Sequence, residues 1–166
     1  SPELLAKRLA SKEKESQQKT VVALSALMFL ASFILAGLDF RYGWTSLPSW
    51  MIWTSTGVLL MSYLMYAEVM RENAYLSRTI EVQDNQKVID TGLYGIVRHP
   101  MYSATVFLFL SMPLILGSMM SFVVMLVYIP IINARIKNEE KVLSEGLPGY
   151  QEYKQKVRSK LIPFIW

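Results

Sequence analysis

The sequence predicts an all-α integral membrane helical bundle of about four transmembrane helices, including a C-terminal helical hairpin. Its 166 residues have a mean hydropathy of +0.28; 52% are hydrophobic and only 18% are charged, which is too apolar for an ordinary soluble domain of this size. Three long stretches, residues 20–38, 42–67 and 101–134, carry no charged side chain. Because about 20 apolar residues cross a bilayer core, each stretch is interpreted as spanning the membrane.

Ahead of these stretches, residues 1–19 have a different character. Leu4, Leu5 and Leu9 lie at helical spacing among charged residues, without the long apolar core of a signal peptide. This pattern predicts an interfacial helix at 1–19. We therefore expect one membrane domain, in which the first two spans occupy residues 20–67 and the remaining part of the chain occupies residues 68–166.

The third apolar stretch is too long for one span. At roughly 1.5 Å per residue, a helix over residues 101–134 would far exceed the hydrocarbon layer of roughly 30 Å. Pro113 and the Gly117-Ser118 pair lie near its middle, where they favour a helix break and a tight turn. The stretch is therefore predicted to fold back as a hairpin of two short spans, which brings the total to four.

The basic residues predict the orientation of these spans. They gather in three segments, which are the N-terminal residues 7–19, the loop 71–98 and the tail 135–160. Since Lys and Arg remain on the cytoplasmic side, both termini and the loop are expected in the cytoplasm. The net charge of +4 then reflects membrane topology and not nucleic-acid binding. With no cysteine in the chain, zinc-thiolate sites and disulfides are excluded, and no metal site is predicted.

The loop between the second and third spans carries the only histidine of the chain. Within it, the letters RTIEVQ alternate like an extended strand, and DTG interrupts the chain before the apolar helix. Pro100 suits the first turn of that helix, which places His99 near its N-cap. His99 is either a simple interfacial cap or a donor that, together with the helix N-terminus, faces an anionic ligand group.

The tail continues the last span as an amphipathic helix to about Gly146. Arg135 and Glu139 stand four residues apart and share a face, with Asn138 one turn from Arg135 and Glu140 beside Glu139. In a soluble helix these residues would form a surface ion pair and a solvated acid. Where a span leaves the lipid, such a cluster is costly unless paired and often marks a functional site.

These motifs together resemble those of the isoprenylcysteine carboxyl methyltransferase family and its phospholipid methyltransferase relatives. The shared order is Gly92-x-Tyr94, Arg98-His99-Pro100-x-Tyr102, a hydrophobic stretch, Glu139-Glu140, and then Tyr150-x-x-Tyr153 with a terminal IPF. The resemblance covers residues 68–166, which it identifies as a methyltransferase catalytic region made of a cofactor-binding cytoplasmic loop, the helical hairpin and the tail.

The resemblance implies that the cofactor is S-adenosyl-L-methionine, bound between the hairpin and the cytoplasmic segments. Its implied contacts are Gln86, Lys87, Val88, Ile89, Tyr94, His99, Pro100, Met101, Tyr102, Glu139 and Glu140. The family's acceptor-orienting arginine falls on Arg135, which is the expected catalytic residue, and Asn138 joins it in binding the acceptor. The implied enzyme faces the cytoplasm and takes its lipophilic acceptor from the bilayer.

Three functions remain open at this point. The first is methyl transfer to a carboxylate of an isoprenylcysteine-like lipid, which Arg135 would clamp. The second is N-methylation of a phosphatidylethanolamine-type headgroup; an amine must first lose a proton, so Glu140 or a tyrosine would have to act as a base. The third is a non-catalytic role as a membrane assembly or transport partner.

Overall fold

The computed structural model describes residues 16–76 and 80–166, and within these ranges the chain is helical and forms no strand. This confirms the all-α class. The helices are α2 (Ser16–Tyr42), α3 (Ser49–Glu72), the 3-10 turn η1 (Gly92–Gly95), α4 (Pro100–Ile115), α5 (Met119–Met125), α6 (Tyr128–Gly146) and α7 (Tyr150–Lys156). The interfacial helix predicted at 1–19 lies outside the described residues, apart from its last few residues, which belong to α2.

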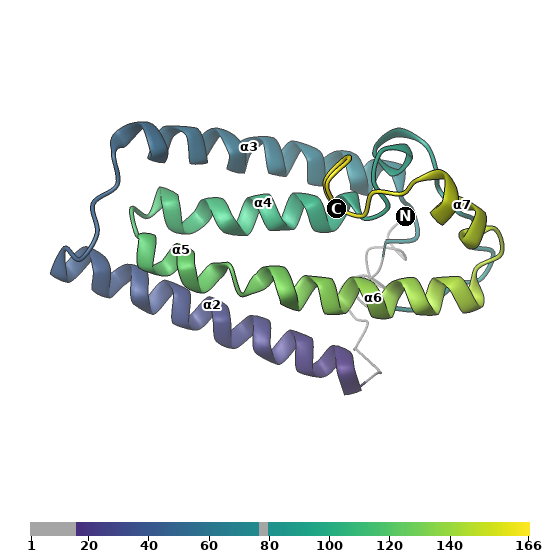
Figure 1. Ribbon diagram of the computed structural model, residues 1–166, viewed down its shortest axis with the longest axis horizontal. Helices are drawn as coiled ribbons and strands as arrows, with labels where there is room; N and C mark the ends of the chain where they lie inside the picture. Colours follow the sequence, from purple (N-terminus) through teal and green to yellow (C-terminus); the bar gives the residue numbers. More distant parts are fainter. Residues whose placement is uncertain (1–15, 77–79) are drawn as a thin grey trace.

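The long helices lie side by side in an elongated bundle (Figure 1). α3 packs mainly against α4, while α2 packs against α5 and α6. Between α4 and α5 the chain reverses at residues 116–118, where Gly117 has a φ of +76°. A left-handed conformation of this kind favours glycine, and Ser118 then caps α5 by accepting a hydrogen bond from Ser121 N. α6 continues in the direction of α5 and carries the chain beyond the bundle.

Two helical stretches within the described residues are long and apolar enough to cross a membrane, Lys19–Tyr42 and Met119–Gly146. The apolar helix α4, Pro100–Ile115, is shorter. α3 is not among these candidates, because its many hydroxyl and aromatic side chains lower its mean hydropathy. The number of four spans therefore stays a prediction.

The uncharged stretch 42–67 contains one helix, α3, which begins only at Ser49, because α2 runs through Tyr42 and a loop over 43–48 follows. One sequence-based expectation needs correction. The alternating RTIEVQ segment does not form a strand over its described residues 80–83. No second strand lies beside it in residues 16–76 and 80–166, and Gln83 N donates instead to the side chain of Gln86 at 2.8 Å. Alternation without a pairing partner does not produce a sheet.

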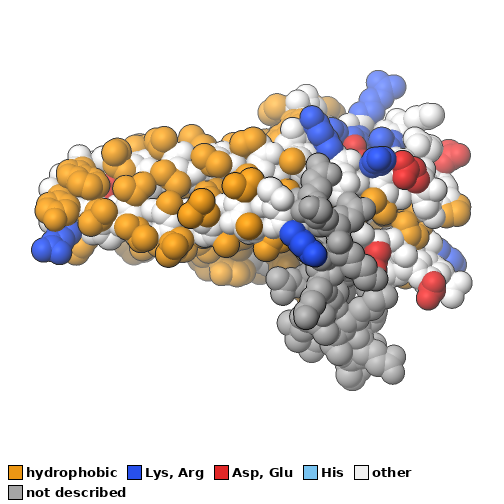
Figure 2. Space-filling model, turned by 90° about the horizontal axis from the view of Figure 1, so that it is seen from below, with side chains coloured by type: hydrophobic (Ala, Val, Ile, Leu, Met, Phe, Trp, Pro, Cys, Tyr) orange, Lys and Arg blue, Asp and Glu red, His pale blue; other side chains and the backbone are white. Residues whose placement is uncertain are grey.

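The surface is divided along the length of the bundle. Figure 2 shows apolar side chains covering the long body, whereas most of the charged side chains gather at the end that contains α7 in Figure 1. Large exposed apolar residues on α2 and α3 include Leu27, Leu30, Phe40, Trp50, Trp53, Met61 and Leu64. A broad exposed apolar body of this kind fits a lipid environment.

At the apolar end, Asp39 joins three parts of the chain. Its carboxylate is 1% exposed and accepts hydrogen bonds from Thr45 N at 2.7 Å, from the Thr45 hydroxyl and from the Ser118 hydroxyl. The end of α2, the following loop and the α4–α5 turn are thus held together. At the other end, Tyr102, Ile136 and Leu161 belong to one buried cluster, so α4, α6 and the tail share a core beside the polar region.

Candidate functional site

A cavity of about 110 Å³ lies where the bundle meets the charged end of the molecule. Its walls come from the end of α3 and the loop that follows, from η1 and the start of α4, and from α6 and α7. The lining residues are Asn73, Tyr75, Leu76, Ile80, Glu81, Gln86, Lys87, Val88, Ile89, Tyr94, Arg98, His99, Met101, Tyr102, Arg135, Glu139, Leu143, Leu147, Tyr150 and Tyr153.

Most of the residues predicted for the site meet at this cavity. The lining includes the predicted residues Gln86, Lys87, Val88, Ile89, Tyr94, His99, Met101, Tyr102, Arg135 and Glu139. Pro100, Asn138 and Glu140 are not among the lining residues. Pro100 is buried as the first residue of α4, and Glu140 faces Arg98 and His99.

His99 is the N-cap residue of α4, as predicted, and only 4% of it is exposed. Its imidazole lies between two carboxylates. Nε2 is 3.2 Å from Glu140 Oε1, within hydrogen-bond distance, and Nδ1 is 3.8 Å from Glu139 Oε1. His99 therefore connects the buried Glu140 with the cavity wall formed by Glu139.

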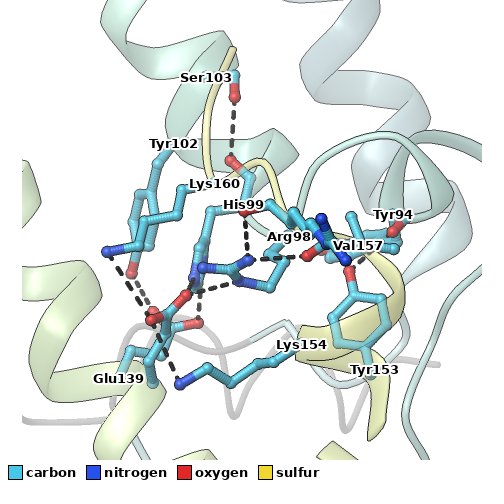
Figure 3. A network of polar contacts seen from close by, with 12 residues as sticks. Tyr94, Arg98, His99, Tyr102, Ser103, Glu139, Tyr153, Lys154, Val157 and Lys160 are labelled. Atoms are coloured by element: carbon cyan, nitrogen blue, oxygen red, sulfur yellow. Dashed lines mark hydrogen bonds and ion pairs between the residues drawn. The ribbon is translucent and has the colours of Figure 1, made fainter. Parts of the chain in front are cut away.

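Glu140 is the centre of a buried ion-pair network. Figure 3 labels its partners Arg98, His99, Lys154 and Lys160. Arg98 Nε donates to Glu140 Oε1 at 2.8 Å, and the two side chains are only 6% and 10% exposed. Lys154 Nζ and Lys160 Nζ lie 3.8 and 4.0 Å from Glu140 Oε2. A buried carboxylate needs compensating charge, which these side chains supply. Glu140 thus joins α6 to the start of α4 and to the tail.

A second polar chain runs along the cavity wall. Arg135 Nε donates to the Tyr102 hydroxyl at 3.0 Å, and this hydroxyl donates in turn to Glu139 Oε2. The two α6 residues stand one turn apart, so both face α4. Tyr102 therefore fixes the orientation of the guanidinium and the carboxylate at once.

The tail binds the start of α4 through main-chain atoms. Arg98 N donates to Ser159 O at 3.0 Å, and His99 N donates to Lys160 O at 2.9 Å. The Arg98 guanidinium also donates to Val157 O at 2.8 Å, and the Ser103 hydroxyl donates to Leu161 O at 2.6 Å. Residues 157–161 thus form a strap that satisfies donors at the helix N-terminus and holds His99 in place.

The turn η1 places Tyr94 in the cavity wall. Gly92, directly before it, has a φ of +52°, and a Cβ there would overlap the carboxylate of Glu72, which accepts a hydrogen bond from Leu93 N at 3.1 Å. The left-handed backbone conformation therefore favours glycine at this position. The Tyr94 hydroxyl then accepts a hydrogen bond from Asn73 Nδ2 at 2.8 Å.

The tyrosines of the site are poor proton acceptors. Burial raises the pKa of Tyr94 to about 12, although the hydrogen bond from Asn73 lowers it in part. Burial likewise raises the pKa values of Tyr150 and Tyr153. All three phenols are therefore neutral at physiological pH, and each can donate a hydrogen bond but cannot serve as a base.

The cavity lining also contains residues that were not among the predicted contacts. Three of them, Arg98, Tyr150 and Tyr153, belong to the motifs that carry the family resemblance, so that resemblance could have identified them. Asn73 and Tyr75 carried no motif signal. They reach the cavity because the chain after α3 folds back, and loop geometry of this kind has no sequence periodicity.

These features define a helical membrane protein with a polar, aromatic-lined cavity at one end of its apolar bundle. The sequence model of the isoprenylcysteine carboxyl methyltransferase (ICMT) family matches residues 51–145, more than half of the chain. The chain therefore belongs to this family, and family membership makes it a membrane methyltransferase by class. No curated protein sequence matches the chain significantly.

The matched region runs from α3 to the end of α6 and includes the His99, Tyr102, Arg135 and Glu139 positions. It starts earlier than the expected resemblance, which began at residue 68, and it ends before α7 and the strap. The cavity nevertheless uses Tyr150 and Tyr153 from α7. The site thus extends beyond the part of the chain that the family model covers.

Proposed function

We propose that the chain is an S-adenosyl-L-methionine-dependent methyltransferase that transfers a methyl group to a lipid-borne acceptor, the carboxylate of an isoprenylcysteine-like lipid. The observation that carries the proposal is the cavity itself, in which Arg135 and Glu139 are fixed through Tyr102 where the charged end meets the apolar bundle. A water-soluble cofactor and a lipid acceptor can both reach such a position.

The donor set of the cavity fits the cofactor. S-adenosylmethionine combines a purine nucleoside with an ammonium and a carboxylate, and the lining offers aromatic rings, the carboxylate of Glu139 and the cations of Arg98 and Lys87. His99 and Tyr94 add further hydrogen-bonding groups. When bound, the cofactor supplies a methyl group on a sulfonium, which departs as a neutral thioether.

The chain itself then needs to align the acceptor rather than activate it. Arg135 is suited to hold a carboxylate by two parallel hydrogen bonds, which places one oxygen in line with the methyl carbon. A carboxylate is already deprotonated and needs no base. A phospholipid amine would need one. Of the two kinds of base expected from the sequence, Glu140 pairs with Arg98, and the tyrosine Tyr94 is protonated because its pKa is about 12. This favours the carboxylate acceptor.

We further propose four spans, with the termini and the cavity in the cytoplasm. The support comes from the distribution of charge. The basic segments after α3 and α6 flank the cavity, whereas at the opposite end of the bundle the only charged residues beside the loop 43–48 are Asp39 and Arg41, at the end of α2. The bilayer and the lipophilic acceptor are then the partners of the chain.

The test combines cofactor binding with labelled methyl transfer. Detergent-purified protein should bind S-adenosylmethionine at equilibrium, and labelled methyl should enter lipid or prenylated protein extracts as a base-labile ester. Absence of cofactor binding would favour the non-catalytic alternative, whereas base-stable product in the phospholipid fraction would identify an amine acceptor.

Variants of Arg135 separate the two acceptors further. For a carboxylate, Arg135→Glu should abolish transfer while cofactor binding persists, and Arg135→Lys should keep only part of the rate because the two-pronged geometry is lost. For a phospholipid, in which the arginine would hold the phosphate, Arg135→Lys should be tolerated well. Near-normal transfer by Arg135→Ala with either acceptor would remove this residue from the mechanism.

A further inference from the structure

Tyr150 has an unusual hydroxyl. The residue lines the cavity and is only 4% exposed, yet its hydroxyl oxygen has no hydrogen-bond partner among the described residues. The other tyrosines of the cavity that have buried side chains are engaged: Tyr94 accepts from Asn73, Tyr102 donates to Glu139, and Tyr153 donates to Tyr94 O at 2.8 Å.

An unpartnered buried hydroxyl is costly, and phenylalanine would fill the same volume without that cost. A second unpartnered hydroxyl belongs to Ser144, but this residue is not part of the cavity lining. An unpartnered, buried hydroxyl on a residue that lines a cavity therefore indicates a partner that enters the cavity.

The lining along α6 indicates which part of a ligand this would be. Arg135, Glu139, Leu143 and Leu147 follow one another at intervals of four residues and all line the cavity. At roughly 1.5 Å per residue they extend over roughly 18 Å, from the charged pair to the aliphatic pair. This wall of the cavity therefore has a charged half near Arg135 and an apolar half near Leu147.

The ring of Tyr150 belongs to the apolar half of this wall. It is buried in one cluster with Leu147, Tyr153 and Val157, against which Val88 packs. Its ring centroid lies 5.8 Å from that of Tyr153. S-adenosylmethionine has the same division, since its flat purine nucleoside is uncharged while its sulfonium, ammonium and carboxylate carry charge.

We infer that Tyr150 is a cofactor-binding residue whose hydroxyl donates a hydrogen bond to the adenosyl group, which lies against Leu143 and Leu147, while the sulfonium end points toward Arg135. This inference rests on the proposed function, because it requires S-adenosylmethionine in the cavity. It also orients the cofactor, because the methyl group then lies at the end of the cavity nearest the apolar bundle.

The test measures equilibrium binding to the full-length, detergent-purified chain with two ligands. S-adenosylhomocysteine carries both halves of the cofactor, whereas 5′-methylthioadenosine lacks the amino acid. Tyr150→Phe should weaken both ligands about tenfold, as expected for one lost hydrogen bond. His99→Ala, at the charged half, should weaken S-adenosylhomocysteine but leave methylthioadenosine unchanged.

Tyr128→Phe is the matched control, because the Tyr128 hydroxyl bonds to Thr105 at 3.1 Å outside the cavity. It should lower the melting temperature of the ligand-free protein without changing ligand affinity. Tyr150→Phe should leave that temperature unchanged or raise it, because no protein hydrogen bond is lost.

Two outcomes would overturn the inference separately from the proposed function. Unchanged affinity of Tyr150→Phe, when the wild-type chain binds both ligands, would refute the role of the hydroxyl and leave the methyltransferase proposal intact. Weakening of S-adenosylhomocysteine alone would place Tyr150 at the amino-acid half and refute the orientation. If the wild-type chain bound neither ligand nor S-adenosylmethionine, the proposed function itself would fail, and this inference with it.

Discussion

Glu140→Ala should destabilise the protein strongly, although the sequence of an ordinary amphipathic helix would place this glutamate in solvent. The substitution removes the carboxylate that accepts from Arg98 Nε at 2.8 Å and lies 3.2 Å from His99 Nε2. The two partners remain, 7% and 4% exposed, without that compensating acceptor. Water cannot replace the carboxylate well in so buried a position.

The size of the effect follows from this burial. Removing one partner of a buried ion pair costs about 3 to 5 kcal/mol, because the other charge stays desolvated. We expect a loss in this range for the free energy of unfolding of Glu140→Ala. Glu140→Gln should lose less, since an amide oxygen still accepts from Arg98 although the charge is gone.

Glu68→Ala provides the matched control. Glu68 also pairs with an arginine, Arg71, but these side chains are 38% and 76% exposed. An exposed pair contributes little, so this variant should unfold like the wild type. Unfolding would be followed by circular dichroism during titration of the detergent-solubilised protein with a denaturing detergent. If Glu140→Ala and Glu68→Ala behaved alike, the idea of Glu140 as the centre of the network would be wrong.

Two further predictions concern the cavity and the topology. His99→Ala and Glu139→Ala should each weaken S-adenosylmethionine binding about ten- to a hundredfold, because each removes a charged or polar group from the cavity wall. The helical content should be retained. Calorimetric titration measures the affinity, and an unchanged affinity in both variants would show that the proposed pocket is wrong. In oriented vesicles, a membrane-impermeant thiol reagent applied from the cytoplasmic side should label Gln151→Cys and not Trp44→Cys. The wild-type chain has no cysteine, so only the introduced thiol can react. The reverse pattern would contradict the proposed orientation.

Much of the fold could be predicted because apolar runs and helix signals are local. The uncharged stretches indicated helices, and Pro100 after His99 marked the start of α4 correctly. The extended pattern at residues 80–83 was misleading, since a strand requires a partner that the sequence of the segment itself does not specify. The span count depends on hydropathy over whole helices, and the hydroxyl-rich α3 shows how a helix can pack in the bundle without being strongly apolar.

The sequence predicted most of the residues that gather at the candidate site, but not which of them face the cavity. Glu139 and Glu140 are adjacent, so their side chains point about 100° apart on a helix, and the motif alone does not indicate which one faces the cavity. The answer lies in tertiary partners. Arg98 holds Glu140 on the far side of His99, and Tyr102 holds Glu139 at the cavity wall.

The strap explains why the tail belongs to the site although the family match ends at residue 145. α4 begins at a proline, and its preceding residues Arg98 and His99 turn their main-chain N–H groups toward Ser159 O and Lys160 O. Without these acceptors, both N–H groups would be left unpaired beside a cavity whose walls they support. The motif Arg-His-Pro thus supplies the side chains, but residues 157–161 determine where those side chains point. Since His99 lies between Glu140 and Glu139, a displacement of the strap would change both the buried network and the cavity wall at once.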